Sequence, residues 1–166
     1  MNQLEHFRKI TTFIFDVDGV LTNSQVLVLE DGKLLRSMNI RDGMAIKEAI
    51  RHGYRICVIT GGKSKGVKIR LQNLGVQDIY LGQSDKMEAY EEYLYTYDIK
   101  AENVLYMGDD LPDLPVMKKV AIAACPQDAA PEIIGIANYV SGIIGGKGCA
   151  RDVIEKVMRV QGKWQT

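Results

Sequence analysis

The chain has 166 residues, 46% of them hydrophobic and 25% charged, and its formal net charge is zero. This length favours one globular domain over two, so we expect residues 1–166 to form a single domain. The balanced charge argues against a general nucleic-acid binder, which would carry a basic excess. No apolar run is long enough to span a bilayer and no signal peptide is evident, so we expect a soluble cytoplasmic protein.

The first predicted core strand covers residues 13–15 and is followed by two carboxylates, Asp16 and Asp18. Side chains two residues apart in an extended chain point the same way, so both acids should meet at the carboxyl edge of the sheet, where open α/β sheets bind ligands. Two close negative charges repel unless a cation or a shared proton joins them. Taken alone, such a pair is more often an acidic turn that closes a strand, and the residues downstream decide between the two.

A β-hairpin is predicted next, over about residues 24–38. Its strands, residues 25–29 and 33–38, flank the turn 30–32, whose Asp-Gly pair is a strong hairpin signal. Residues 26–29 form an unbroken apolar run. A hairpin with apolar side chains on both faces cannot hide them against one sheet, so we expect this flap to pack on another surface, such as another subunit.

Strands and helices then alternate along the chain. The predicted strands are residues 55–59, 79–81, 104–107, 120–124 and 138–140, and the predicted helices are residues 44–51, 64–73, 86–97, a short one ending at 119, one within 126–136, and 150–160. We expect residues 39–43 to form a polar loop in which Asp42 caps the first of these helices. The C-terminal tail, residues 142–166, starts with a glycine-rich stretch. This alternation predicts an α/β fold, a Rossmann-like three-layer sandwich with a mainly parallel sheet.

Chemically useful side chains fall at or just beyond the ends of these strands. They are Asp16 and Asp18, Thr60, Lys86, and the acids Asp109, Asp110 and Asp113. In a parallel sheet the carboxyl ends share one edge, so these groups should face one crevice. Carboxylate oxygens suit Mg²⁺, while a hydroxyl and an ammonium group suit the oxygens of a phosphoryl group. The pattern therefore predicts a magnesium-dependent site for phosphoryl transfer.

Four segments of the chain resemble the four motifs of the haloacid dehalogenase superfamily of phosphohydrolases. They are residues 15–22, residues 59–61, Lys86 and residues 108–113. The resemblance implies that Asp16 is the nucleophile and that Asp18 is the general acid and base. It also implies that Mg²⁺ is held by the carboxylates of Asp16 and Asp109 and by the backbone carbonyl of Asp18.

By the same resemblance, Thr60 and Lys86 would grip the phosphoryl oxygens, and Asp110 and Asp113 would be auxiliary partners of the metal site. Mg²⁺ and Lys86 would cancel the repulsion between an attacking carboxylate and a phosphate dianion. Asp18 would protonate the leaving oxygen and then activate water against an aspartyl phosphate.

A closer resemblance, to the octulosonate phosphatases of the capless branch, covers nearly the whole chain. Its segments are residues 39–43, 82–86, 109–117 and 145–152. This resemblance implies Mg²⁺-dependent hydrolysis of 3-deoxy-D-manno-octulosonate 8-phosphate, a step in lipopolysaccharide sugar biosynthesis. It implies that the hairpin flap stands in place of an inserted lid domain. It further implies a homotetramer whose hairpins form a central barrel and whose active sites are each closed by a neighbouring subunit.

The same resemblance implies a set of contacts to the sugar phosphate. The residues are Asp18, Asn39, Ile40, Arg41, Asp42, Gly43, Lys47, Thr60, Gly61, Arg70 and Lys86. Arg41 or Arg70 could pair with the sugar carboxylate, because a guanidinium makes bidentate bonds to carboxylates. Arg70 could equally be a solvated helix residue, and Arg151 could either reach a neighbour's site or simply begin a helix.

Gly62 is the main departure from the pattern of these phosphatases, which usually have Arg after Thr-Gly. Lys63 could replace the missing charge, or the substrate could differ. Phosphatases of nonulosonate 9-phosphates typically have Glu at that position and Lys further along the helix, and neither Gly62 nor Asn73 matches. The eight-carbon substrate is therefore favoured, with a nine-carbon sugar acid phosphate as the alternative.

Two alternatives lie outside the enzymes. A phospho-receiver switch also uses acids, a Thr and a Lys on a parallel sheet, but it accepts phosphate on an acid after the third strand, and the third predicted strand here ends at Leu81 without one. A degenerate assembly domain would be expected to have lost its acids, whereas Asp16 and Asp18 are both present.

Overall fold

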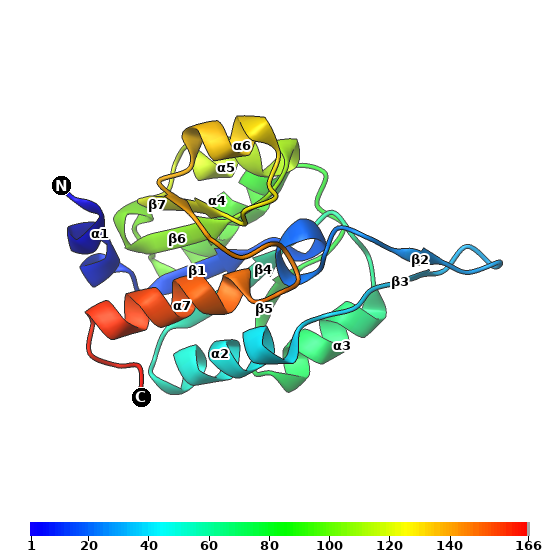
Figure 1. Ribbon diagram of the computed structural model, residues 1–166, viewed down its shortest axis with the longest axis horizontal. Coiled ribbons are helices and arrows are strands. Elements are labelled where there is room, and N and C mark those ends of the chain that lie inside the picture. The colour runs from blue at the N-terminus through cyan, green and yellow to red at the C-terminus, as the bar shows by residue number, and fades with distance from the viewer. Residues whose placement is uncertain (166) are drawn as a thin grey trace.

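The computed structural model describes residues 1–165, and its centre is a six-stranded sheet (Figure 1). The strands are β1 (Thr12–Phe15), β4 (Arg55–Ile59), β5 (Asp78–Tyr80), β6 (Val104–Met107), β7 (Ile122–Cys125) and β8 (Tyr139–Val140). They lie in the order β5-β4-β1-β6-β7-β8, and every pair of neighbours is parallel, which confirms the predicted sheet. β7 begins two residues later than predicted, because Val120 and Ala121 lie in a bend before the strand.

Helices cover both faces of the sheet, which gives the predicted three layers (Figure 1). The helices are α1 (Gln3–Lys9), α2 (Ile40–Arg51), α3 (Lys65–Asn73), α4 (Lys86–Tyr97), α5 (Leu114–Met117), α6 (Pro131–Ile136) and α7 (Cys149–Val160), with short 3₁₀ turns at Ala101–Asn103 and Leu111–Asp113. One core packs α1, α2, α3 and α7 on the sheet, and a second core packs α4, α5 and α6 on the opposite face. Within residues 1–165, no helix combines the length and the apolar character needed to cross a membrane.

β1 contributes to both cores because its side chains alternate. Phe13 and Phe15 belong to the core under α2 and α7, while Ile14 belongs to the core under α4. All four residues of β1 are buried, as expected for a central parallel strand that is covered on both faces. The carboxyl end of this strand is therefore held firmly from both sides of the sheet.

Two helices differ from the sequence prediction at their starts. α2 begins at Ile40, so residues 39–43 are not the predicted polar loop. Asn39 is the N-cap, because its side chain accepts the backbone N–H of Asp42 at 3.0 Å, and the prediction that Asp42 caps this helix was wrong. α1 was not predicted from the sequence pattern, and it is a short helix that buries only Phe7.

The predicted hairpin is present as two very short antiparallel strands, β2 (Leu27–Val28) and β3 (Leu34–Leu35). It extends away from the sheet, at the right of Figure 1. We use the name flap for residues 24–38. Leu27 and Val28 are each 63% exposed, so the apolar residues of the flap lie in solvent in the single chain.

Candidate active site

Three neighbouring strands at the centre of the sheet bring polar side chains to one edge. Asp16 directly follows β1, Thr60 directly follows β4, and Asp109 follows β6 after one intervening residue. Because β1 pairs in register with β4 on one side and β6 on the other, these side chains emerge next to one another. Asp85 caps α4, so that Lys86 reaches the same edge from the first turn of that helix.

Gly19 shapes the loop that follows Asp16. The carboxylate of Asp16 accepts the backbone N–H of Val17 at 2.7 Å, and the chain then turns tightly through Val17–Leu21. Gly19 has a φ of +91°, and a Cβ at this position would collide with the carboxylate of Asp109. Only glycine fits, because it alone combines this φ with the missing side chain.

Lys86 lies between two carboxylates and is 5% exposed. Its Nζ is 2.9 Å from Oδ1 of Asp16 and 2.7 Å from Oδ1 of Asp113. Asp113 is fully buried, and it also accepts the hydroxyl of Tyr106 at 2.6 Å and the backbone N–H of Asp109 at 3.0 Å. Tyr106 was missed by sequence reasoning, because a tyrosine inside an apolar strand has no local signal that distinguishes it from a core residue.

Burial and mutual repulsion control the charges of this cluster. Burial raises the pKa of Asp16 well above its usual value, and Asp113 adds to the rise while Lys86 opposes it. Burial and Asp113 raise the pKa of Asp109 to about 7. Burial by itself would lower the pKa of Lys86, but Asp16 and Asp113 outweigh it, so the net shift is upward. A lysine that stays charged beside acids that resist ionisation marks a site poised for a further cation.

The carboxylates of Asp16, Asp109 and Asp113 have oxygens that all lie within 4.8 Å of one another. Hard carboxylate oxygens are the ligands that Mg²⁺ prefers. Burial is the main cause of the raised pKa values of Asp16 and Asp109, and a cation among the three acids would relieve the repulsion from Asp113 that adds to it. The donor set therefore fits a divalent cation. Asp16 and Asp109, two of the residues expected to ligate Mg²⁺, lie together here, whereas the carboxylate of Asp18 is outside this group.

The side chain of Asp18 is held instead by Arg36 of the flap. Nε of Arg36 is 2.6 Å from Oδ1 of Asp18, and Nη2 is 3.3 Å from Oδ2. The hydrogen bond to Asp18 raises the pKa of Arg36. Arg36 was not among the residues expected from the sequence, because its role depends on how the flap folds back toward the sheet.

A cavity of about 300 Å³ lies where β1, β4 and β6 end, and we name this part of the sheet the catalytic edge because the residues expected to be catalytic lie there. Its lining consists of Asp16, Asp18, Ser24, Thr60, Gly61, Lys86, Asp109, Asp110, Pro112 and Asp113. Thr60 is buried, and its Oγ1 accepts the backbone N–H of Gly62 at 3.1 Å. This cavity brings together every residue that the sequence placed in the catalytic or metal-binding set.

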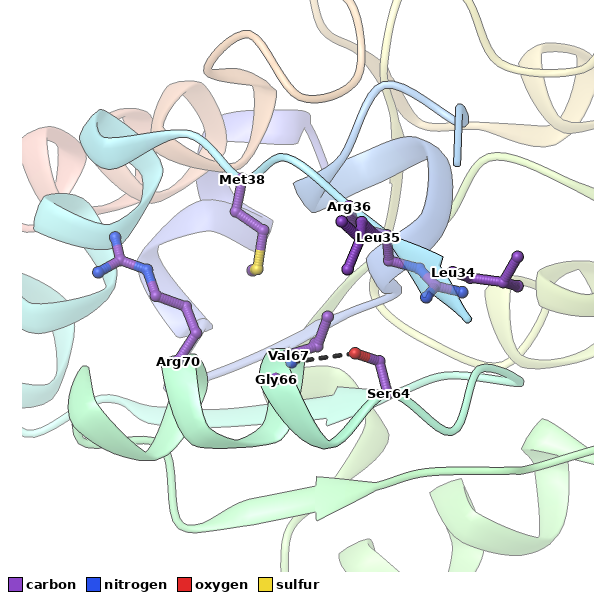
Figure 2. A pocket seen from close by; sticks show the side chains of 8 residues that line it. All are labelled: Leu34, Leu35, Arg36, Met38, Ser64, Gly66, Val67 and Arg70. Carbon is purple, nitrogen blue, oxygen red and sulfur yellow. Dashed lines mark hydrogen bonds between the residues drawn. The ribbon is translucent and has the colours of Figure 1, made fainter. Parts of the chain in front are cut away.

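A second cavity, of about 400 Å³, lies between the flap and α3 (Figure 2). Its lining consists of Leu34, Leu35, Arg36, Met38, Ser64, Gly66, Val67 and Arg70. Figure 2 shows Arg36 and Arg70 at opposite ends, with Met38 between them. Because Arg36 lines this cavity and also bonds to Asp18, it connects the space under the flap to the catalytic edge.

The residues of α2 that were expected to touch the substrate lie apart from the catalytic cavity. The group comprises Asn39, Ile40, Arg41, Asp42, Gly43 and Lys47, and none of them lines that cavity in the part of the chain described. Ile40, Arg41 and Lys47 are exposed. Gly43 lies beside Arg70, where a Cβ would come within 2.8 Å of the guanidinium. Arg70 is thus directed at the start of α2.

Asp42 is a buried carboxylate that joins α2 to α7. Its Oδ1 accepts the backbone N–H of Arg151 at 2.9 Å, in the first turn of α7, while its Oδ2 has no hydrogen-bond partner among residues 1–165. Burial raises the pKa of Asp42 to about 6. The side chain of Arg151 lies along its own helix, with Nε 3.4 Å from Glu155, and its guanidinium stacks over the ring of Trp164.

Comparisons with known proteins agree with one another. Residues 72–150 match the family model described as haloacid dehalogenase-like hydrolase. A protein of Escherichia coli (strain K12), 3-deoxy-D-manno-octulosonate 8-phosphate phosphatase, is 41% identical over 154 residues, which cover 93% of this chain and 82% of that protein.

Solved structures are similar over almost the whole chain. The crystal structure of 3-deoxy-D-manno-octulosonate 8-phosphate phosphatase from Yersinia pestis matches with a TM-score of 0.94 and 37% identity, and covers 96% of this chain and 86% of that one. The corresponding structure from Moraxella catarrhalis, in complex with magnesium ion, phosphate ion and KDO, matches with a TM-score of 0.92 and 27% identity, and covers 96% of this chain and 91% of that one.

Proposed function

The chain belongs to the haloacid dehalogenase-like hydrolases, and we propose that it hydrolyses 3-deoxy-D-manno-octulosonate 8-phosphate to the free sugar acid and phosphate, with Mg²⁺ as cofactor. The observation that carries this proposal is the cluster of Asp16, Asp109 and Asp113 around one point, with buried Lys86 bonded to two of the three. The substrate is taken from similar proteins. These are the relatives named for this activity and the structural neighbour in complex with magnesium ion, phosphate ion and KDO.

Asp16 is the proposed nucleophile. One of its carboxylate oxygens attacks phosphorus while the bond between phosphorus and the sugar oxygen breaks, which gives an aspartyl phosphate and the free sugar acid. Lys86, 2.9 Å from Asp16, would reduce the repulsion between this carboxylate and the phosphate dianion. The hydroxyl of Thr60 faces the same cavity and would hold a phosphoryl oxygen.

Asp18 is the proposed acid and base. It would give a proton to the departing sugar oxygen and then accept a proton from the water that attacks the phosphorus of the aspartyl phosphate. That second attack releases inorganic phosphate and restores the carboxylate of Asp16. Asp16 and Asp18 therefore have separate roles, and they also have separate environments, the first beside Lys86 and the second beside Arg36.

The carboxylates of Asp16 and Asp109 and the backbone carbonyl of Asp18 would hold Mg²⁺. The ion would supply positive charge to the phosphoryl oxygens. We give Asp113 an orienting role, because its two oxygens already accept hydrogen bonds from Lys86, Tyr106 and two backbone N–H groups. Asp110, which is exposed and caps the 3₁₀ turn Leu111–Asp113, would support this loop.

The sugar acid would occupy the space between the catalytic cavity and the cavity under the flap. Arg70, at the far end of that second cavity, is a suitable partner for the sugar carboxylate, and Asn39, Ile40, Arg41, Gly43 and Lys47 would contribute from the start of α2. Asp42 and Arg151 are better explained by the contact between α2 and α7.

We extend the proposal to the assembly and the compartment. A homotetramer in which the flaps form a central barrel would bury the exposed apolar residues of Leu27–Val28 and Leu34–Leu35. Residues 1–166 would act in it as one catalytic domain. The buried, unpaired cysteines Cys57, Cys125 and Cys149 agree with a reducing compartment such as the cytoplasm.

The test is a comparison of kcat/KM for 3-deoxy-D-manno-octulosonate 8-phosphate and a nonulosonate 9-phosphate, with Mg²⁺ and with a chelator. We expect a preference of at least about tenfold for the eight-carbon ester, equivalent to about 1.4 kcal/mol, and loss of activity on chelation. Asp16→Asn is the control, with an expected loss of about 10³-fold or more. A preference for the nine-carbon ester would replace the proposed substrate by its alternative.

A further inference from the structure

We propose that Arg36 is a positioning residue that aims the carboxylate of Asp18 at the water which hydrolyses the aspartyl phosphate. This inference rests on the proposed function and adds a residue from the flap to it. Nε and Nη2 of Arg36 contact Oδ1 and Oδ2 of Asp18 at 2.6 and 3.3 Å. The Arg36 side chain is 8% exposed, whereas the neighbouring Leu34 and Leu35 of the flap are exposed.

Both ends of the flap contact acids of the proposed active site. Ser24, at the start of the flap, lies with Oγ 3.4 Å from Oδ2 of Asp109, and Arg36, near its end, holds Asp18. Ser24 has a φ of +67°, an uncommon conformation for a residue with a side chain, and such conformations gather at functional sites. The flap is thus attached to the molecule through groups of the reaction centre.

Gly62 provides the space that the guanidinium of Arg36 occupies. A Cβ at Gly62 would lie 3.2 Å from Nη2 of Arg36 and 3.5 Å from Oδ2 of Asp18. A longer side chain at this position would meet the same guanidinium. The missing side chain at Gly62 therefore leaves the room in which the guanidinium of Arg36 contacts Asp18.

The hydrogen bonds between Arg36 and Asp18 indicate which half-reaction Arg36 supports. Arginine has only donors, so a contact to both oxygens of Asp18 uses that side chain as an acceptor carboxylate, which is the form that acts as a base. A planar, two-point contact also fixes the orientation of the carboxylate, which a lysine cannot do with its single ammonium group. Arg36 should therefore matter more for the second half-reaction than for the first.

The test uses Arg36→Met and Arg36→Lys in the full chain, with Lys33→Met, an exposed cation of the same flap, as the matched control. For Arg36→Met we expect kcat to fall about 10²-fold and kcat/KM, which reports the first half-reaction, to fall less than about fivefold. Rapid mixing should then show a burst of the first product, approaching one per active site, because the aspartyl phosphate accumulates. Lys33→Met should behave as the wild type.

Arg36→Lys keeps the charge but loses the two-point contact, so its kcat should stay at least about tenfold below that of the wild type. Recovery of kcat in Arg36→Lys would overturn the inference, since charge alone would then suffice. Equal losses in kcat and kcat/KM for Arg36→Met, with no burst, would also overturn it.

Gly62→Ala approaches the pair from the other side and leaves the flap sequence intact. It should lower kcat several-fold in the wild type and have no further effect in Arg36→Met, because the contact it disturbs is already gone. Equal effects in both backgrounds would contradict the arrangement. If the wild type hydrolyses another phosphate ester but not the octulosonate ester, the proposed substrate fails, and the same burst measurement with that ester still decides the role of Arg36.

Discussion

The catalytic edge of the sheet and the flap are built in opposite ways. At the edge, the ionisable side chains of Asp16, Lys86 and Asp113 are almost fully buried, and each has partners within the same chain. In the flap, Leu27 and Val28 are apolar and 63% exposed. A buried charge without a partner is destabilising, so the chain itself must supply the partners at the edge. Exposed apolar side chains are tolerated in the single chain and can be buried by a second surface.

The two regions are connected at Asp18 and Asp109, which the flap touches through Arg36 and Ser24. The single chain therefore holds the complete charge cluster, while the apolar side chains of its flap stay exposed. In the proposed homotetramer, the surface that covers the flap would also bear on these two acids.

Removing the central cation of the edge should have the largest effect. Lys86→Met leaves Asp16 and Asp113 without their shared partner, and we expect kcat/KM to fall by about 10²–10³-fold, as for the loss of other preorganised donors. Lys119→Met, an exposed lysine outside the cavity, is the control and should be unaffected. Steady-state kinetics at saturating Mg²⁺ measures this. Activity of Lys86→Met within fivefold of the wild type would mean that the edge does not need its cation.

Within the described part of the chain, the buried carboxylate of Asp42 accepts a backbone N–H and forms no ion pair, which sharpens the contrast with the edge. Asp42→Ala removes the acceptor for the Arg151 N–H in α7, and we expect the free energy of unfolding to fall by about 1–2 kcal/mol. Asp42→Asn keeps an acceptor and removes the charge, so at neutral pH it should be as stable as the wild type or more stable.

The pKa of Asp42 also predicts a pH dependence. The folded value of about 6 lies above the unfolded value of about 3.9, so the stability contributed by the protonated group is present at low pH and is lost as pH rises through about 6. Urea unfolding of the wild type between about pH 4 and 7 should show this decline. Asp42→Asn should show a smaller decline, because Asp16 and Asp109, whose pKa values are also raised, still contribute to it. An equal decline in both proteins would exclude Asp42 as a source.

Magnesium binding at the edge should depend on pH. The pKa of Asp109 is about 7 without a cation, so protons compete with Mg²⁺ below that pH, and affinity should weaken by up to about tenfold per unit as pH falls. Isothermal titration calorimetry in buffers of different ionisation enthalpy measures both the affinity and the protons released. Affinity that is constant between about pH 6 and 8, with no proton release, would contradict the charge balance derived for the cluster.

Changes in the flap should have the smallest effect on the chain itself. Leu27→Asp with Leu35→Asp places two charges at a cross-strand pair that is exposed, so the stability of an isolated subunit should change by only about 0.5 kcal/mol. The proposed homotetramer should dissociate into smaller species, and light scattering after size-exclusion chromatography would measure this change in mass. Tyr95→Asp, at a still more exposed apolar site on α4, should leave the proposed homotetramer intact. If the double variant keeps the size of the wild type, the flap is not part of the interface between subunits.

The catalytic edge could be predicted from the sequence because its geometry follows from local patterns. Short apolar runs ending at Asp16, Thr60 and Asp109 define parallel strands, and the carboxyl ends of such strands meet. α2 was predicted too short because residues 39–43 were interpreted as a polar loop with Asp42 as the cap, whereas Asn39 supplies the cap.

The contacts of Arg36 and Tyr106 could not be predicted in this way. The side chain of Arg36 reaches Asp18 through the space left by the missing side chain of Gly62, and no local sequence pattern predicts this contact. Tyr106 has an ordinary position in a buried strand, and its hydroxyl can donate to Asp113 only because the loop that carries Asp113 lies beside it. Both depend on tertiary structure rather than on spacing.

Trapping the covalent intermediate would show whether Asp16 attacks the phosphoryl group. The protein is mixed with the sugar phosphate and Mg²⁺, quenched in acid within the first turnover, and digested for mass spectrometry. We expect one phosphoryl group on the peptide that contains Asp16, and none in Asp16→Asn. A phosphoryl group on a different residue, or full turnover by Asp16→Asn, would contradict the account.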